Sequence, residues 1–285
     1  MNFDFYKYHA LGNDYIVIDP SKTKINLSEE NIRLICHRNF GIGSDGILYG
    51  PLFKDNTIHL KIFNPDGSEA EKSGNGIRIF SRFLSDAGYV ENNEFKLATL
   101  GGDVHVKLLD EKGSKIQVDM GMVTFQSQMI PVAGPAREVL NERLLINNHK
   151  LDITCLSIGN PHCVVHCDEI SQEMTCDLGK TIEEHDNFPN RINVQFLKVI
   201  DRSNIRIEIW ERGAGYTLAS GSSSCAAASA AYRMGLVDNV VHVHMPGGII
   251  KVEIHNDGHV FMTGPVLHVS KGFFAEDLWD RIQEK

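Results

Sequence analysis

The chain of 285 residues lacks the features that mark several large classes of protein. It has no run of Lys or Arg and carries a net charge of −9 at pH 7, whereas a nucleic-acid-binding surface is basic. No apolar stretch approaches the roughly 18 residues of a membrane-spanning helix. The first ten residues also lack the basic and then apolar order of a signal peptide. We therefore expect a cytoplasmic protein with no nucleic-acid or membrane partner.

The six cysteines form no recognisable metal or disulfide pattern. None belongs to a Cys-x-x-Cys pair, and Cys163 and Cys167 have no second pair at zinc spacing. Disulfides are rare in cytosolic proteins, so we interpret the cysteines as small buried hydrophobic residues. The sequence also has no phosphate-binding loop followed by a helix and no dinucleotide fingerprint. It therefore predicts neither a metal nor a cofactor.

The sequence does contain an internal repeat. Gly12-Asn13 opens an apolar run, and Gly159-Asn160 opens another 147 positions later. The same offset of 147 relates Asn64 to Glu211 and Ser73-Gly74 to Ser220-Gly221. Matches in one order and at one offset indicate two copies of an ancestral domain. Two such domains would offer similar groups to opposite faces of one small ligand, because ligand sites often lie at domain interfaces.

The pattern of apolar residues predicts an α+β fold of two pseudo-symmetric domains. Alternating residues indicate many strands, whereas helices are expected only over 28–38, 76–87 and 222–234. Each domain is predicted to be a curved, mostly antiparallel sheet around one central helix. We assign residues 1–122 to the first domain and 123–269 to the second, with a linker near 121–135. The tail, 270–285, is expected to pack on the first domain.

Two Ser-Gly pairs begin the predicted central helices. A helix N-terminus presents unpaired N–H groups and a positive dipole end, and small residues let a ligand approach them. Ser73 with Gly74 and Asn75, and Ser220 with Gly221 and Ser222, are therefore candidates for binding a carboxylate. The alternative is that both serines are only N-caps, a role that Ser favours.

Polar residues follow several predicted strands, where binding groups often concentrate. Arg212 could grip a carboxylate with two parallel hydrogen bonds. Glu211 and asparagines could hold an ammonium group. The alternative for each asparagine is a turn, because Asn tolerates left-handed backbone. The candidates in this polar lining are Asn13, Asn64, Asn160, Asn193, Glu211 and Arg212.

His162 follows the repeated Gly159-Asn160 closely, which makes it a candidate for tuning acid–base chemistry. A lone His is more often a structural residue with satisfied hydrogen bonds, and that alternative stays open.

Four segments together resemble the diaminopimelate epimerase family: "YHALGNDYIVID", "NPDGSEAEKSGNG", "IGNPHCVVH" and "WERGAGYTLASGSSSCAAA". The resemblance runs from the first residues to about Gly264. It implies a cofactor-independent isomerase that inverts the α-carbon of L,L-diaminopimelate to the meso form, in the lysine and peptidoglycan precursor pathway. It also implies an amino-acid substrate with two carboxylates and two amino groups, and a homodimer.

The resemblance assigns roles to individual residues. Gly74, Asn75, Gly221 and Ser222 would bind the carboxylate at the reacting carbon, and Asn13 would contact its amino group. His162 and Glu211 resemble the partners that tune the two proton-transferring groups. The distal ammonium and carboxylate would be recognised by Asn64, Asn160, Asn193, Glu211 and Arg212.

The chain departs from the family at the two proton-transferring positions. Ser73 and Ser220 stand where the family has cysteines, and Tyr216 stands where it usually has Glu. A Ser hydroxyl is a poor base near neutral pH and needs an adjacent base. Three explanations stay open: a natural serine-based epimerase, an engineered variant that traps its substrate, and a related isomerase or dehydratase acting on another amino acid. The alternative to an enzyme is a silenced homologue that binds an amino acid without turning it over.

Overall fold

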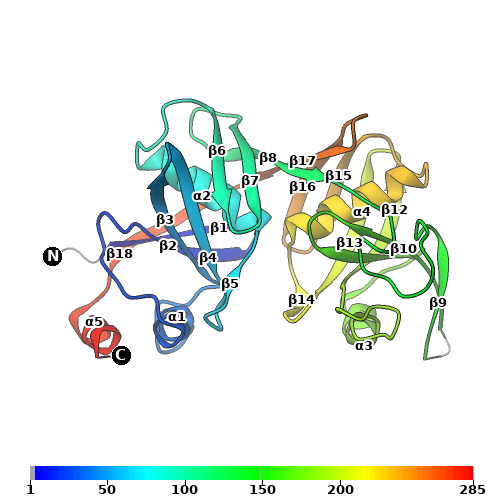
Figure 1. Cartoon of the computed structure of the whole chain (residues 1–285), viewed down its shortest axis with the longest axis horizontal. Helices are drawn as coiled ribbons and strands as arrows, with labels where there is room; N and C mark the ends of the chain where they lie inside the picture. Colours follow the sequence, from blue (N-terminus) through cyan, green and yellow to red (C-terminus); the bar gives the residue numbers. More distant parts are fainter. Residues whose placement is uncertain (1–3, 148, 285) are drawn as a thin grey trace. The chain divides into compact units, whose positions relative to one another are not determined.

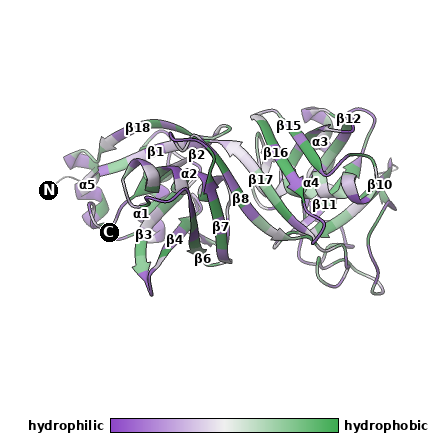
Figure 2. Cartoon of the chain, turned by 90° about the horizontal axis from the view of Figure 1, so that it is seen from above, coloured by the Kyte–Doolittle hydropathy of each residue, from purple (hydrophilic) through white to green (hydrophobic). Residues whose placement is uncertain are grey.

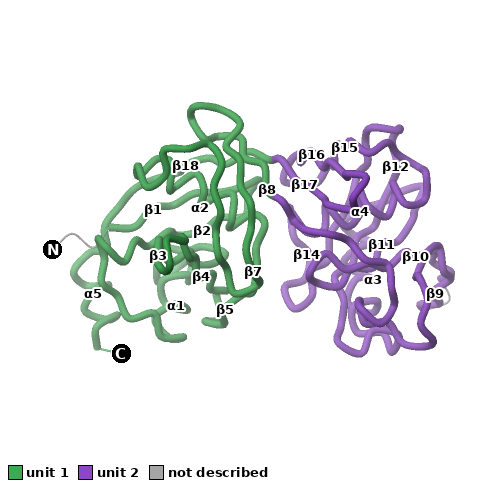
Figure 3. Tube along the Cα trace, turned by 45° about the horizontal axis from the view of Figure 1, so that its top comes forward, with its two compact units in different colours: residues 1–118, 264–285 green, residues 119–263 purple. Residues whose placement is uncertain are grey.

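The chain forms two compact units of strands and helices. The computed structural model describes residues 4–147 and 149–284. Unit 1 contains the described residues up to Val118 and those from Gly264 onward, and unit 2 runs from Asp119 to Thr263 (Figure 3). These units are defined by contacts alone. The domain boundaries predicted from the sequence, after residues 122 and 269, remain a prediction.

The elements of unit 1, including β8 where the chain leaves it, follow the chain order shown in Figure 1. They are β1 (Asp4–Ala10), β2 (Asn13–Ile18), α1 (Glu29–Cys36), β3 (Ile47–Lys54), β4 (Thr57–Phe63), β5 (Glu69–Ala70), α2 (Gly74–Asp86), β6 (Glu94–Thr99), β7 (Gly102–Leu108), β8 (Lys115–Met122), β18 (Leu267–Phe273) and α5 (Glu276–Gln283).

Unit 2 contains the elements between β8 and β18, and β17 ends just beyond it. They are β9 (Glu142–Ile146), β10 (His149–Ser157), β11 (Pro161–His166), α3 (Gln172–Glu183), β12 (Asn193–Asp201), β13 (Asn204–Glu211), β14 (Gly215–Thr217), α4 (Gly221–Arg233), β15 (Val240–Met245), β16 (Gly248–Ile254) and β17 (His259–Pro265). This mixture of many strands with few helices is the α+β class that the sequence predicted.

The strands of the two units pair in the same sequence of directions. In unit 1, β2 pairs parallel with β3, β3 antiparallel with β4, β4 parallel with β6, and β6 antiparallel with β7. In unit 2, β11, β12, β13, β15 and β16 pair as parallel, antiparallel, parallel and antiparallel in the same way. The repeat in the sequence therefore has a counterpart in strand topology.

One long helix is buried within each unit. Helix α2 is lined by large apolar residues such as Ile79, Phe80 and Phe83, which are fully buried. Helix α4 is made mostly of small residues, and Ala226, Ala227 and Ala228 are also fully buried. Ala is the strongest helix former, and its small side chain lets strands approach α4 closely. Both helices lie within a few residues of their predicted positions.

Some strands bury one face and expose the other, whereas others, such as β2 and β11, are buried along nearly their whole length. Burial alternates along β7, where Val104, Val106 and Leu108 face inward between exposed neighbours. Apolar and polar colours alternate along such strands in Figure 2. This period of two is the signal from which the strands were predicted.

The end of the chain completes the core of unit 1. Strand β18 pairs antiparallel with β1. Phe274, Trp279 and Ile282 join one buried cluster with Ile32 and Ile35 of α1. The side chain of Asn31 also donates to the backbone oxygen of Ile282 at 3.0 Å. Residues separated by most of the chain therefore build one core.

Helices α3 and α5 were not predicted. Helix α3 contains Gly179 near its middle, and Gly disfavours a helix interior. A Cβ atom at Gly179 would lie 2.6 Å from Cγ of Trp210, so the glycine admits the indole ring. Close packing against Trp210 thus explains a residue that weakened the helix signal. Among the described residues, no helix is both long enough and apolar enough to cross a membrane.

Candidate active site

Ser73 caps the N-terminus of α2. Its backbone is extended, and its Oγ accepts the N–H of Gly76 at 3.1 Å. The same Oγ lies 3.2 Å from the hydroxyl of Tyr15 on β2. Ser73 therefore has a capping role, as the alternative interpretation held, and its hydroxyl also has a phenol as a neighbour.

Strand β2 contacts the first turn of α2 through two side chains of one face. Asn13 and Tyr15 are two residues apart, so they point to the same side of the strand. The Asn75 side chain donates to Oδ1 of Asn13 at 3.0 Å, and Arg78 donates to Oδ1 of Asn75 at 2.7 Å. Asn13 in turn donates to the Asp45 carboxylate at 3.0 Å. The structure thus brings Asn13, Ser73, Gly74 and Asn75 together.

Asn64 lies in the turn after β4. Its side-chain nitrogen donates to Oγ of Ser68 at 2.9 Å, and its backbone N–H bonds to the Ser68 oxygen at 2.8 Å. These contacts fit the turn role that was the alternative for each asparagine. The described hydrogen bonds do not link Asn64 to the group around Ser73.

Ser220 caps α4 in unit 2 with nearly the backbone conformation of Ser73. Its φ and ψ are −143° and 127°, against −136° and 116° at Ser73. Its Oγ accepts the N–H of Ser223 at 3.4 Å and lies 3.5 Å from Oγ of Ser222. Ser220 is 4% exposed. Ser220, Gly221 and Ser222 therefore form one helix start, in which the Ser222 hydroxyl lies beside the capping hydroxyl of Ser220.

His162 is fully buried on β11. Its Nε2 lies 2.9 Å from Oδ1 of Asn160. Burial lowers its pKa to about 3, and a nearby hydrogen-bonding side chain, Gln195, opposes this only in part. The positive charge of Arg212 lowers the pKa further. His162 is therefore neutral near pH 7, and Asn160 holds its ring.

Gln195 connects this region to the start of α4. It is fully buried on β12, and its Nε2 donates to Oγ of Ser223 at 3.0 Å. Nδ1 of His162 and Oε1 of Gln195 are both buried, and the Gln195 side chain lies close enough to His162 to oppose part of the fall in its pKa. No pattern in the sequence pointed to Gln195.

Asn193 and Arg212 are joined through the backbone. The Asn193 side chain donates to the oxygen of Pro161 at 2.9 Å and accepts the backbone N–H of Arg212 at 3.0 Å. The Arg212 side chain is exposed and donates to the oxygen of Asn190 at 3.1 Å. Glu211, half-buried at the end of β13, precedes it. Asn193 thus fixes the loop that presents Arg212.

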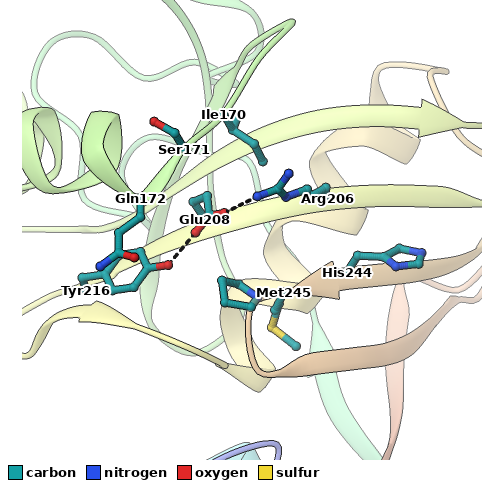
Figure 4. A pocket seen from close by; sticks show the side chains of 9 residues that line it. Ile170, Ser171, Gln172, Arg206, Glu208, Tyr216, His244 and Met245 are labelled. Atoms are coloured by element: carbon teal, nitrogen blue, oxygen red, sulfur yellow. Dashed lines mark hydrogen bonds and ion pairs between the residues drawn. The ribbon is translucent and has the colours of Figure 1, made fainter.

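A pocket of 470 Å³ lies elsewhere in unit 2. Its lining includes Ser171, Arg206, Glu208 and Tyr216, but neither Ser220 nor His162 (Figure 4). The buried Glu208 carboxylate accepts the Tyr216 hydroxyl at 2.7 Å and an Arg206 nitrogen at 2.9 Å. Burial and this hydrogen bond raise the pKa of Tyr216. The uncharged Tyr216 hydroxyl donates a hydrogen bond to the Glu208 carboxylate, whereas a Glu at position 216 would place a second negative charge beside Glu208.

The cysteines are mostly buried, as expected. Cys36, Cys155, Cys163 and Cys225 are buried, whereas Cys167 is half-buried and Cys176 is exposed. The interpretation of all six as buried is therefore wrong for Cys176, which lies on the outer side of α3. Over residues 4–147 and 149–284, no group of three His, Cys, Asp or Glu side chains is arranged to hold a metal ion.

The fold is shared with solved structures of amino-acid racemases and epimerases. A probable proline racemase from Agrobacterium radiobacter K84 superposes with a TM-score of 0.70 at 15% identity, covering 97% of this chain and 94% of that one. A hydroxyproline epimerase from Agrobacterium vitis superposes with a TM-score of 0.69 at 14% identity, covering 99% and 97%. At such identities these likenesses define the fold alone.

The sequence comparisons define the family. The family profile described as diaminopimelate epimerase matches residues 5–126 and 154–269. The "Diaminopimelate epimerase 2" of Nostoc sp. is 53% identical over 276 residues, which are 96% of each chain. The diaminopimelate epimerase of Moorella thermoacetica is 39% identical, over 96% of this chain and 99% of its own. The chain therefore belongs to the diaminopimelate epimerase family, whose members are isomerases.

Proposed function

We propose that this protein is a cofactor-independent epimerase that interconverts L,L- and meso-diaminopimelate, or acts on a close amino-acid analogue. The reaction would supply the lysine and peptidoglycan precursor pathway. Ser73 and Ser220 would be the proton-transferring groups, one acting on each face of the substrate α-carbon. The observation that carries the proposal is the placement of these two hydroxyls at the starts of two buried helices, at positions 147 apart in a repeat.

The helix starts favour binding of the carboxylate beside the reacting carbon. The first N–H groups of a helix have no partner within it, and the helix dipole favours an anion there. Gly74 and Gly221 have no side chain to obstruct a ligand. We assign the carboxylate to these glycines, Asn75 and Ser222, and the amino group to Asn13.

The distal end of the substrate would be recognised mainly by Arg212. Its side chain is exposed, and a guanidinium group suits a carboxylate. Asn193 supports it through the backbone N–H of Arg212. Asn64, Asn160 and Glu211 complete the assigned set, although the contacts of Asn64 and Asn160 give them local structural roles as well.

Proton transfer is the step that the serines make difficult. An aliphatic hydroxyl ionises far less readily than a thiol, so each serine needs help from its surroundings. Helix N-termini stabilise an anion, and polar groups directed at the developing charge lower the barrier further. The neutral His162 and the carboxylate of Glu211 are the candidate tuning groups.

The test is exchange of the α-proton of L,L- and meso-diaminopimelate in D2O, followed by NMR. The unmodified protein is expected to exchange the proton and interconvert the isomers. The Ser73→Cys/Ser220→Cys variant is expected to be faster, because a thiolate is the better base. The matched control is Ser28→Cys/Ser171→Cys, which alters the caps of α1 and α3 and leaves the two helix starts intact.

The departure from cysteine at positions 73 and 220 favours a second candidate. A protein that binds an amino acid without turning it over would bind diaminopimelate but exchange nothing until both cysteines are present. Release of ammonia from a β-hydroxy amino acid would instead identify a dehydratase. Absence of exchange from every variant, with no binding, would reject the proposed substrate.

A further inference from the structure

Tyr15 occupies in unit 1 the position that His162 occupies in unit 2. The two residues are 147 positions apart, and each follows a repeated Gly-Asn by two residues. Tyr15 lies on β2 and His162 on β11, which hold the same place in the order of strand pairing. The repeat thus places a phenol where its second copy has an imidazole.

The Tyr15 hydroxyl is held beside the proposed reacting atom. It lies 3.2 Å from Oγ of Ser73, and Tyr15 is 7% exposed. The Ser73 oxygen already accepts the N–H of Gly76. An added donor from Tyr15 would therefore make a second hydrogen bond to the same oxygen, and hydrogen bonds to an anion favour the charged form.

Close packing fixes the Tyr15 ring. A Cβ atom at Gly46 would lie 2.7 Å from Cε1 of Tyr15. Real Cβ contacts of this kind essentially do not occur, so the ring fits only because residue 46 is Gly. The backbone N–H of Ile16 bonds to the Gly46 oxygen at 3.1 Å and holds the two segments together. The phenol is therefore positioned by packing as well as by its hydrogen bond.

We propose that Tyr15 is the positioning and proton-sharing partner of Ser73, an inference that rests on the proposed function. When Ser73 protonates the α-carbanion, the Cα–H bond forms as the Ser73 O–H bond breaks. The Tyr15 O–H proton then moves to the Ser73 oxygen and leaves a phenolate. Through solvent water, the phenolate regains the proton that the base on the opposite face removed from the substrate, so the cycle has no net gain or loss of protons. A phenol is a stronger acid than an aliphatic hydroxyl, so it bears this charge more easily than Ser73.

Tyr15→Phe tests the role because it removes only the hydroxyl. We expect kcat for α-proton exchange to fall roughly tenfold to a hundredfold, at or below the lower end of the range for direct general acid–base catalysis, because Tyr15 acts through Ser73, with KM changed less than about twofold. Tyr8→Phe is the matched control. Tyr8 lies directly opposite Tyr15 in the β1–β2 pair, is fully buried, and donates its hydroxyl to Asp86 instead. Equal losses in the two variants would overturn the proposal.

A second measurement decides the proposal without any substrate. In Ser73→Cys, the rate of alkylation at position 73 is followed against pH by peptide mass spectrometry, with and without Tyr15→Phe. Loss of the phenol donor should lower the rate near pH 7 by roughly threefold to tenfold, because a hydrogen-bonded thiolate has a lower pKa. An unchanged profile would overturn the role of Tyr15. Failure of every variant to exchange the α-proton would reject the proposed function alone, because the alkylation profile still tests the Tyr15 contact.

Discussion

His162 is a neutral side chain in the interior of unit 2, and its chemistry follows from that burial. Its Nε2 lies 2.9 Å from Oδ1 of Asn160, a contact that suits a neutral ring with the proton on Nε2. A neutral imidazole can accept a proton, but burial makes the imidazolium costly. At the residue scale, His162 is therefore better suited to making hydrogen bonds as a neutral ring than to carrying a positive charge.

Burial of His162 predicts a pH-dependent stability. Burial lowers its pKa to about 3, whereas an unfolded His titrates near about 6.5. Between these values the unfolded state binds the extra proton, so the free energy of unfolding falls as pH falls, by at most about 1.4 kcal/mol per pH unit. Above about pH 6.5 this contribution is constant. Urea unfolding of wild type and His162→Gln from pH 7 to 4 should show the variant losing less stability.

His105→Gln is the control for that series. His105 is an exposed residue of β7, so its replacement should keep the pH dependence of the wild type. A His162→Gln variant with the same pH dependence as the wild type would show that folding does not lower the pKa of His162.

At the scale of elements, the start of a helix combines a structural and a chemical role. Four helices have a serine cap whose Oγ accepts a backbone N–H: Ser28 for α1, Ser73 for α2, Ser171 for α3 and Ser220 for α4. Capping alone therefore does not distinguish Ser73 and Ser220. The distinction lies in their surroundings. Helices α2 and α4 are buried and begin with small residues. Glu29 and Glu173, in contrast, place negative charges in the first turns of α1 and α3, where they would repel a carboxylate ligand.

This difference predicts that the four capping serines contribute alike to stability, whereas only two of them contribute to activity. Replacing any of the four capping serines by Ala should lower the free energy of unfolding by about 1 kcal/mol. Only Ser73→Ala and Ser220→Ala should also slow α-proton exchange, by roughly a hundredfold or more. Denaturant unfolding and NMR exchange measured on the same four variants check both parts. If Ser171→Ala lost as much activity as Ser220→Ala, the two serines would be caps and nothing more.

The elements also show what the sequence could reveal. The starts of α2 and α4 were predictable, because Ser-Gly precedes a helix-forming run in both copies. Helix α3 was not, because Gly179 is explained only by the Trp210 ring that packs on it. Tyr15 was overlooked although the offset of 147 relates it to His162, since a Tyr within an apolar run looks like an ordinary core residue. Gln195 depends on contacts between strands and a helix that no local pattern records.

At the scale of the whole molecule, each unit has its own apolar core, and the chain leaves unit 1 and returns to it. One buried cluster joins α1, β1, β2 and the end of the chain. Another joins strands β9 to β12 with α3. Since the last residues belong to the first cluster, unit 1 is complete only when the end of the chain has been added.

Phe274→Ala should therefore loosen unit 1 and spare unit 2. Phe274 is 1% exposed, and its ring centroid lies 5.3 Å from that of Phe5 and 5.9 Å from that of Trp279. Truncating a buried Phe costs about 3–5 kcal/mol. Hydrogen exchange followed by mass spectrometry should show faster exchange in β1, α1 and α5, with little change in β9 to β12. Phe273→Ala, at a neighbouring position that is 71% exposed, should leave exchange nearly unchanged. Equal loss of protection in both units would contradict the separation of the cores and show that the protein opens as one cooperative body.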